Sequence, residues 1–414
     1  LALLAYVRYA ERPSARKMGL VFGALLAGLM SKAVLIALPP ILLLLDYWPL
    51  RRTPAAGAGT AWKGWKPRLA EKAGLIVLAA AFTGLNLWTH ESGRGAGSHV
   101  SVVSRLGLIA PNYFDYLEKI AAPIRLNVIY PENDAVSWPV SIAALLALSA
   151  ATAWAIRARE KRPFVAVGWL WFLVALLPVI RGVRLGFAQA ADRFGYLPLI
   201  GLGIAAAWTA GEWAERRPRQ RPALGLAGGL VLAACLVRTP AQLGWWGNSA
   251  MLFQRAVFLA PGSSMAHDSL GLALRDAGRD EEGAFQFREA VRLNPRAAGS
   301  WNNLGNALVA LGRTNEALAA FEEALALEPD LAEAHYNLGG ALFRAGKVPD
   351  ALPHFEAAAR LAPGQAVNWY DLGITYAQLG RYAEAAPCVD RALRLDPELP
   401  GAKWARIRLQ TLGF

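Results

Sequence analysis

The last part of the chain repeats itself every 34 residues, and no other feature limits its fold as strongly. Each copy carries a ring-bearing residue, a Leu-Gly pair, a second Gly, a small residue, a large apolar residue (Phe in three copies, Val389 in the fourth), Ala and a closing Pro at fixed offsets. Four copies in register leave little room for chance. They occupy about 264–297, 298–331, 332–365 and 366–399, and the markers of the second are Trp301, Leu304, Gly305, Leu308, Gly312, Ala317, Phe321, Ala324 and Pro329.

This period and pattern are those of the tetratricopeptide repeat (TPR), a helix, a tight turn and a second helix. The glycine represented by Gly312 suits a helix C-terminus with positive φ. Pro329 ends the second helix because proline cannot continue a helical turn. One such hairpin cannot bury its own apolar face, so the copies are expected to stack into a superhelix with a concave groove. A half repeat at 247–261 and a capping helix at 400–414 complete the predicted array.

TPR grooves usually hold a peptide or a partner protein. The inner-face side chains of this array either bind such a partner or only solvate a helix face, and the sequence leaves both interpretations open. The paired Lys and Asn residues of a carboxylate clamp are missing, so no specificity for a C-terminal peptide follows. The expected groove residues are Asn302, Asn306, Tyr336, Arg344 and Tyr370, with Asp268 and Gln378 beside them.

The first 246 residues differ from the repeats in hydropathy and in charge. Hydrophobic residues make up 55% of the 414, which is too apolar for an ordinary soluble protein. Residues 1–246 hold 27 Lys and Arg against 12 Asp and Glu, whereas 247–414 hold 16 against 19. The basic excess falls in short loops between apolar segments, so membrane topology explains it better than a nucleic-acid partner. Cys235 and Cys388 imply neither a disulfide framework nor a metal site.

The predicted fold class is therefore all-α, a polytopic transmembrane helix bundle (1–246) followed by a TPR α-solenoid (247–398). The loops with many Lys and Arg all fall on one side, and the positive-inside rule assigns that side to the cytoplasm. The repeats then face the periplasm, at the inner membrane of a bacterium. The spanning segments are expected at Ala73–Trp88, Ser137–Ile156, Phe164–Ile180, Tyr196–Ala214 and Ala223–Val237.

Three further segments have less regular patterns. Residues 18–47 form either a short hairpin around Ser31 and Lys32 or one long helix bent at Pro39 and Pro40. Residues 105–130 are amphipathic and are expected to lie as an interfacial helix on the outer face. Leu1–Ala10 looks like the end of another span.

Four strings of the membrane part form a recognisable set: SKAVLIALPPILLLLDYWPL (31–50), YLEKIAAPIRLNVIYP (116–131), VGWLWFLVALLPVI (167–180) and ADRFGYLPLIGL (191–202). Followed by TPRs, the set resembles bacterial relatives of the transmembrane-and-TPR protein O-mannosyltransferases, which belong to the GT-C class of polytopic glycosyltransferases. The resemblance implies sugar transfer from a polyprenyl-phosphate carrier to a protein acceptor on the exoplasmic face, often with a divalent cation.

In that class an acidic residue in the first exoplasmic loop is typically catalytic. The resemblance places this loop before Leu1, so the chain is expected to be the C-terminal part of a longer protein. No catalytic residue or metal ligand can then be assigned to a position of this sequence. The alternative function is a non-catalytic, membrane-anchored TPR scaffold for envelope protein assembly.

Five residues of the membrane part are candidates for the site of such an enzyme. Lys32 and Arg193, with Asp192 beside it, could bind the lipid-linked phosphate, because a lysine in an apolar segment and an arginine fork both suit that anion. The alternatives are a lysine that snorkels from a hairpin and an internal Asp192–Arg193 pair. His90 and Glu91 could contact the acceptor, although two adjacent residues are weak evidence for a metal. Walker, dinucleotide-binding, HExxH and GxSxG motifs are absent.

Overall fold

The computed structural model describes residues 1–31, 33–52, 61–92, 101–123, 126–129, 136–180 and 192–414. All regular secondary structure within these ranges is helical, which confirms the all-α prediction for the described part of the chain. The chain divides into two compact units, which we call unit 1 (Leu1–Gln242) and unit 2 (Leu243–Phe414). The sequence predicts this boundary after residue 246.

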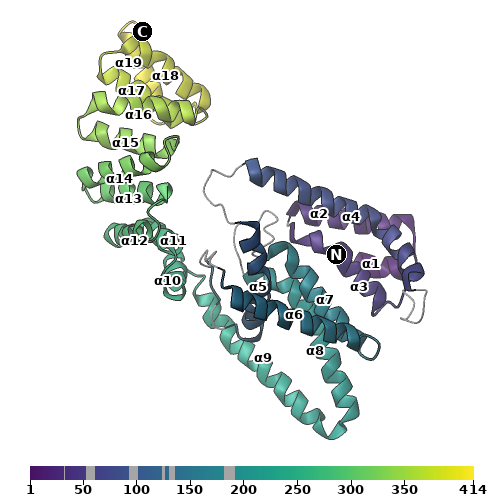
Figure 1. Ribbon diagram of the computed structural model, residues 1–414. Coiled ribbons are helices and arrows are strands. Elements are labelled where there is room, and N and C mark those ends of the chain that lie inside the picture. The colour runs from purple at the N-terminus through teal and green to yellow at the C-terminus, as the bar shows by residue number, and fades with distance from the viewer. Residues whose placement is uncertain (32, 53–60, 93–100, 124–125, 130–135, 181–191) are drawn as a thin grey trace. The chain divides into compact units, whose positions relative to one another are not determined.

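Unit 1 contains the apolar helices (Figure 1). Short 3₁₀ segments, η1 (Ala33–Ala37), η2 (Leu177–Val179), η3 (Asp192–Gly195) and η4 (Pro218–Gln220), connect some of them. The α-helices are α1 (Ala2–Glu11), α2 (Ala15–Ser31), α3 (Leu38–Tyr47), α4 (Ala61–Ser92), α5 (Val102–Ala121), α6 (Trp138–Ala158), α7 (Pro163–Leu176), α8 (Tyr196–Arg216) and α9 (Arg221–Gly244).

Three segments of the described residues are long and apolar enough to cross a membrane. They are Gly64–Asn86 in α4, Trp138–Ala158 in α6 and Pro218–Gly244, which includes α9. No residue of α9 is buried. The predicted span at 164–180 corresponds to a shorter apolar helix, Pro163–Val179, and α8 does not meet the same criterion. Length and composition thus support three of the five expected spans as candidates.

The segment between residues 18 and 47 is broken rather than continuous. α2 ends at Ser31, and α3 begins at Leu38 after η1. Pro39 and Pro40 lie in the first turn of α3, where proline is tolerated because its missing N–H has no intrahelical acceptor. The alternative of one long helix bent at these prolines is therefore wrong.

A pair of glycines lets α7 and α8 approach closely. A Cβ added to Gly201 would lie 2.6 Å from the carbonyl oxygen of Gly168, and one added to Gly168 would overlap the carbonyl oxygen of Gly201. Helices of apolar bundles pack closely where small residues face each other.

Unit 2 is a stack of helical hairpins (Figure 1). Each full repeat has a first and a second helix, and each second helix ends two residues before the proline that closes its repeat. Ala405 and Leu409 of the last helix pack on Ala385 and Val389, so this helix caps the fourth repeat as predicted. The helices are α10 (Ser249–Leu259, the half repeat), α11 (Ser264–Asp276), α12 (Asp280–Leu293), α13 (Ala298–Ala310), α14 (Thr314–Leu327), α15 (Ala332–Arg344), α16 (Val348–Leu361), α17 (Ala366–Gln378), α18 (Tyr382–Leu395) and α19 (Ala402–Thr411).

The turn inside each repeat has the predicted left-handed glycine. The φ angles of Gly278, Gly312, Gly346 and Gly380 are 73°, 71°, 77° and 75°. After Gly312 the N–H of Arg313 donates to the carbonyl of Leu308 at 2.9 Å, which closes the end of the first helix.

The glycine after the repeat leucine is needed for a different reason. A Cβ on Gly305 would lie 2.5 Å from the ring of Phe321, which is 0% exposed. Gly271 stands in the same relation to Phe287, at 2.7 Å. The two helices of these repeats therefore pack closely, and the phenylalanine ring of the second helix occupies the space that a Cβ atom on the glycine of the first helix would need.

Candidate functional site

The first helices of successive repeats are joined by side-chain hydrogen bonds between residues 35 positions apart. Each bond links the fifth residue of one repeat to the sixth residue of the next, so polar groups bridge all three junctions between full repeats. We call this set the junction ladder. Its pairs are Asp268 with Asn303 (3.2 and 3.3 Å to the two carboxylate oxygens), Asn302 with Asn337 (2.9 Å) and Tyr336 with Asp371 (2.7 Å).

The junction ladder changes the interpretation of Asn302. Its side chain is only 2% exposed and its Oδ1 accepts the hydrogen bond of Asn337 Nδ2. Asn302 was expected to line the groove, but its side chain is buried within the junction of the second and third repeats, where its oxygen bonds Asn337.

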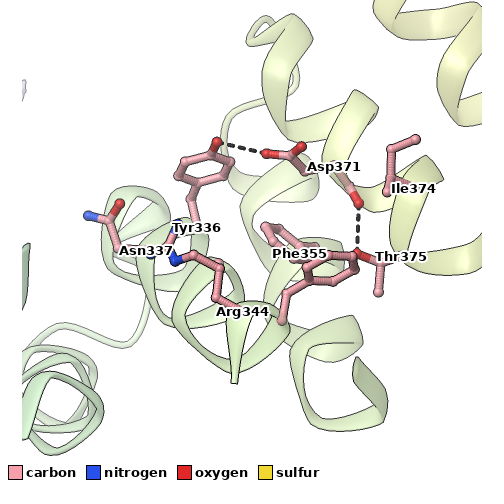
Figure 2. A pocket seen from close by; sticks show the side chains of 9 residues that line it. Tyr336, Asn337, Arg344, Phe355, Asp371, Ile374 and Thr375 are labelled. Atoms are coloured by element: carbon pink, nitrogen blue, oxygen red, sulfur yellow. Dashed lines mark hydrogen bonds between the residues drawn. The ribbon is translucent and has the colours of Figure 1, made fainter. Parts of the chain in front are cut away.

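A pocket of about 160 Å³ opens at the junction between the third and fourth repeats (Figure 2). Residues of α15 and α17 line it, together with Phe355 of α16. Gly340 contributes to the opening, because a Cβ there would meet nothing closer than Arg344 Nη1 at 3.8 Å. The lining residues are Tyr336, Asn337, Gly340, Phe343, Arg344, Phe355, Asp371, Ile374 and Thr375.

Most polar groups of the pocket are already hydrogen-bonded. Tyr336 donates to Asp371 Oδ2, and the hydroxyl of Thr375 donates to the backbone carbonyl of Asp371 at 2.7 Å (Figure 2). Asn337 donates to Asn302. Among the described residues, Asp371 Oδ1 accepts no hydrogen bond and Arg344 makes no ion pair. The pocket therefore offers a carboxylate oxygen of Asp371 and the guanidinium of Arg344 to a ligand, beside the side-chain oxygen of Asn337, for which the described residues provide no donor.

The electrostatics of Asp371 reflect its position in the pocket wall. Burial raises the pKa of its carboxyl above the ordinary value, while the hydroxyl of Tyr336 and the charge of Arg344 act in the opposite direction. Burial, followed by the hydrogen bond to Asp371, raises the pKa of the Tyr336 phenol, which stays neutral at physiological pH. Asp371 is thus a partly desolvated carboxylate without a counter-charge in contact.

The pocket brings together two of the predicted groove residues, Tyr336 and Arg344. Asn306 lies half-buried in α13, and Tyr370 packs at the start of the cap, where a Cβ on Gly401 would lie 2.6 Å from its hydroxyl. The prediction missed Asn337 and Asp371, which occupy the sixth position of their repeats, although that position shares the inner face with the fifth. It also missed Gly340, Phe343, Phe355, Ile374 and Thr375.

The candidate residues of unit 1 stay predictions. Lys32 lies outside the described residues. His90 and Glu91 belong to the end of α4, and Asp192 and Arg193 to η3, but their side chains also lie outside the described part. Within that part, no group of three or more His, Cys, Asp or Glu side chains could hold a metal ion.

Unit 1 contains a buried ionic cluster that the sequence analysis did not anticipate. Asp46 and Lys72 are both 0% exposed, and Lys72 Nζ lies 2.5 Å from Asp46 Oδ2. Asp46 Oδ1 accepts from the hydroxyl of Tyr6 at 2.6 Å and from Arg52 at 3.1 Å. Arg52 also pairs with Glu71 at 3.1 Å. The cluster joins α1, α3 and α4, and its charges satisfy one another.

Comparison with known proteins identifies the class of unit 2. Family models for the tetratricopeptide repeat match residues 269–330, 302–366 and 366–399. The C-terminal region of the chain therefore consists of tetratricopeptide repeats. No curated protein matches the chain significantly.

Solved structures of TPR proteins are similar to the chain at low identity. MamA from Desulfovibrio magneticus RS-1 is 24% identical, with 36% of this chain and 85% of that one covered and a TM-score of 0.34. YrrB, described as a TPR protein with an unusual peptide-binding site, is 23% identical, with coverages of 48% and 97% and a TM-score of 0.34. PilF of Pseudomonas aeruginosa is 21% identical, with coverages of 44% and 80% and a TM-score of 0.38.

Proposed function

We propose that unit 2 binds a segment of a partner protein along the inner face of its first helices, with one side chain of that segment inserted between α15 and α17. The observation that carries this proposal is the pocket, which combines apolar lining residues with polar groups that have no partner among the described residues, Asp371 Oδ1 and the Arg344 guanidinium among them. Its volume of about 160 Å³ is close to that of a cavity that holds a benzene ring (~150 Å³), so it suits one side chain.

Filling the pocket from within should abolish this binding. Gly340→Leu introduces the residue that stands at the same position of the first repeat, Leu272, so this helix position accepts leucine. We expect peptides selected on the wild-type chain from a random library to lose most of their affinity for the variant. Thermal unfolding in detergent should show no loss of stability, because an added Cβ has open space.

Gly340→Ala is the matched control, since it changes the same residue but leaves most of the pocket empty. It should retain the selected peptides. Undiminished peptide affinity in the Gly340→Leu protein, measured by biolayer interferometry, would show that the pocket does not hold the ligand.

We propose further that unit 1 anchors the protein in a bacterial inner membrane, in contact with lipid, and that the repeats are periplasmic. The three candidate spans and the clustering of Lys and Arg in alternate loops support this arrangement. Protease added to spheroplasts should then cut the repeats without detergent. Cleavage only after lysis would overturn the orientation.

A second candidate function comes from unit 1. The four strings that resemble the O-mannosyltransferase relatives each contribute to one apolar cluster, with Val34, Tyr116, Phe172 and Phe194 among its members. The resemblance of these strings is the ground for a glycosyltransferase-like membrane unit that takes sugar from a polyprenyl phosphate, with the divalent cation that the resemblance implies. The repeats would then orient the protein acceptor.

Arg193→Ala tests this second candidate. If Arg193 binds the lipid-linked phosphate, its loss should reduce sugar transfer in membranes that contain the longer protein, with the catalytic loop expected before Leu1, by about tenfold or more, because a charge-assisted hydrogen bond is lost. Peptide binding by the repeats should not change. Transfer at the wild-type rate would remove Arg193 from the site, and a protein without any transfer activity would favour the non-catalytic scaffold for envelope assembly.

A further inference from the structure

We propose that the pocket between α15 and α17 selects a basic side chain, Lys or Arg, of the bound segment, with Asp371 as its counter-charge. This inference rests on the proposed function of unit 2 and adds the chemical class of the anchoring residue. The repeats themselves carry more acidic than basic residues, 19 against 16 over 247–414, which also favours a cationic partner.

The two carboxylates of the junction ladder show why the site lies here. Both oxygens of Asp268 lie within hydrogen-bond distance of Asn303 Nδ2, so that carboxylate is satisfied by its own repeat junction. Asp371 receives one bond, from Tyr336, at a single oxygen. A half-buried carboxylate with a free oxygen gains more from a cation than one that is already paired.

The walls of the pocket suit the stem of a basic side chain. Phe343, Phe355 and Ile374 supply apolar surface, and the absent side chain of Gly340 leaves the entrance open. Lys and Arg bury their methylene stems against apolar surface while the charged head reaches a polar group. Asp371 lies in the same wall, where its Oδ2 accepts a hydrogen bond from the hydroxyl of Tyr336 (Figure 2).

Arg344 also lines the pocket and carries the opposite charge. Its side chain is exposed, so solvent and salt screen its charge more than they screen a charge in the wall. We assign Arg344 to the backbone carbonyls or an acidic residue of the same segment, outside the pocket. The alternative, in which Arg344 draws an acidic side chain into the pocket, predicts the opposite selection.

A phage-displayed random peptide library, selected on the purified full chain in detergent, separates these cases. We expect wild-type protein to enrich peptides with Lys or Arg at one position. Asp371→Asn keeps an oxygen for the hydroxyl of Tyr336 but removes the charge. It should reduce the affinity of the enriched peptides roughly 10- to 100-fold. Arg344→Gln should retain the basic preference.

The stability of the Asp371→Asn variant provides a second readout. Burial raises the pKa of Asp371 in the folded state. Ionised Asp371 therefore lowers the free energy of unfolding at neutral pH, and this loss disappears below the pKa of the unfolded state, where the carboxyl is protonated in both states. The variant should therefore unfold at the same or a higher temperature than wild type at pH 7, so its lost affinity cannot be attributed to unfolding.

The outcomes distinguish this inference from the proposed function. If Gly340→Leu abolishes peptide binding but Asp371→Asn leaves it intact, the pocket binds a ligand that is not selected by charge, and only this inference fails. Enrichment of Asp or Glu that Arg344→Gln removes would also overturn it. If Gly340→Leu has no effect on binding, the proposed function itself fails.

Discussion

Asp46→Ala is expected to destabilise unit 1 by about 3–5 kcal/mol, since it leaves a buried lysine without its counter-charge. Asp46 and Lys72 are fully buried and in contact, and Asp46 also accepts hydrogen bonds from Tyr6 and Arg52. Removing the carboxylate breaks three interactions at once. The effect should appear as a lower unfolding temperature in detergent and a smaller monodisperse fraction after purification.

Two further variants identify the cause. Asp46→Asn retains oxygen for the hydrogen bonds but not the charge, so it should fall between wild type and Asp46→Ala. The double variant Asp46→Leu with Lys72→Met replaces the ion pair by apolar side chains and should recover much of the loss. If Asp46→Ala unfolds at the wild-type temperature, the cluster does not stabilise unit 1.

Gly305→Ala is expected to destabilise the second repeat by about 1–3 kcal/mol, because overpacked cores must shift backbone or side chains. The new methyl group would lie 2.5 Å from the ring of Phe321, which is fully buried and cannot withdraw. Hydrogen exchange of the full chain, followed by mass spectrometry, should show faster exchange in α13 and α14.

Gly340→Ala is the control for helix propensity. Gly305 and Gly340 both lie inside first helices, but a Cβ on Gly340 has open space. Gly340→Ala should therefore slow exchange in α15, since alanine is better than glycine in a helix interior by about 1 kcal/mol. Slower exchange in both variants would mean that the second repeat relaxes around the added methyl group.

The repeat architecture could be predicted because its determinants are local. A glycine at a helix end, a small residue opposite an aromatic ring and a proline after a helix each act within one repeat, and their spacing is visible as a period. Gly312 and Phe321 have the conformation and burial that this period predicts. The half repeat follows the same pattern, with Phe253, Ala256 and Pro261 at the offsets of a second helix.

The pocket could not be predicted in the same way, because it arises between repeats. The pairing of Tyr336 with Asp371 depends on the angle between successive first helices, which no single repeat encodes. The pocket also depends on the absence of a side chain at Gly340. The other full repeats have Leu272, Asn306 and Ile374 at this position. The expected groove residues stand at the fifth, ninth and thirteenth positions of the repeat, whereas Asn337 and Asp371 stand at the sixth.

The ionic cluster of unit 1 was missed for a related reason. The charges between residues 51 and 72 indicate a side of the membrane by their sign and number, but their sequence does not show which of them pair. Tyr6 and Asp46 are 40 positions apart, and Asp46 and Lys72 are 26 apart, so their contact follows only from the packing of α1, α3 and α4.

The position of the pocket within the array has a consequence for how the repeats come apart. In a linear stack each repeat is held only by its neighbours, so the array frays from its ends. The Tyr336–Asp371 bond lies at the last junction between full repeats, beside the end that α19 closes. A segment that bridges α15 and α17 crosslinks the terminal repeat to the rest of the stack. A ligand in the pocket should thus raise the free energy needed to unfold the fourth repeat and the capping helix locally.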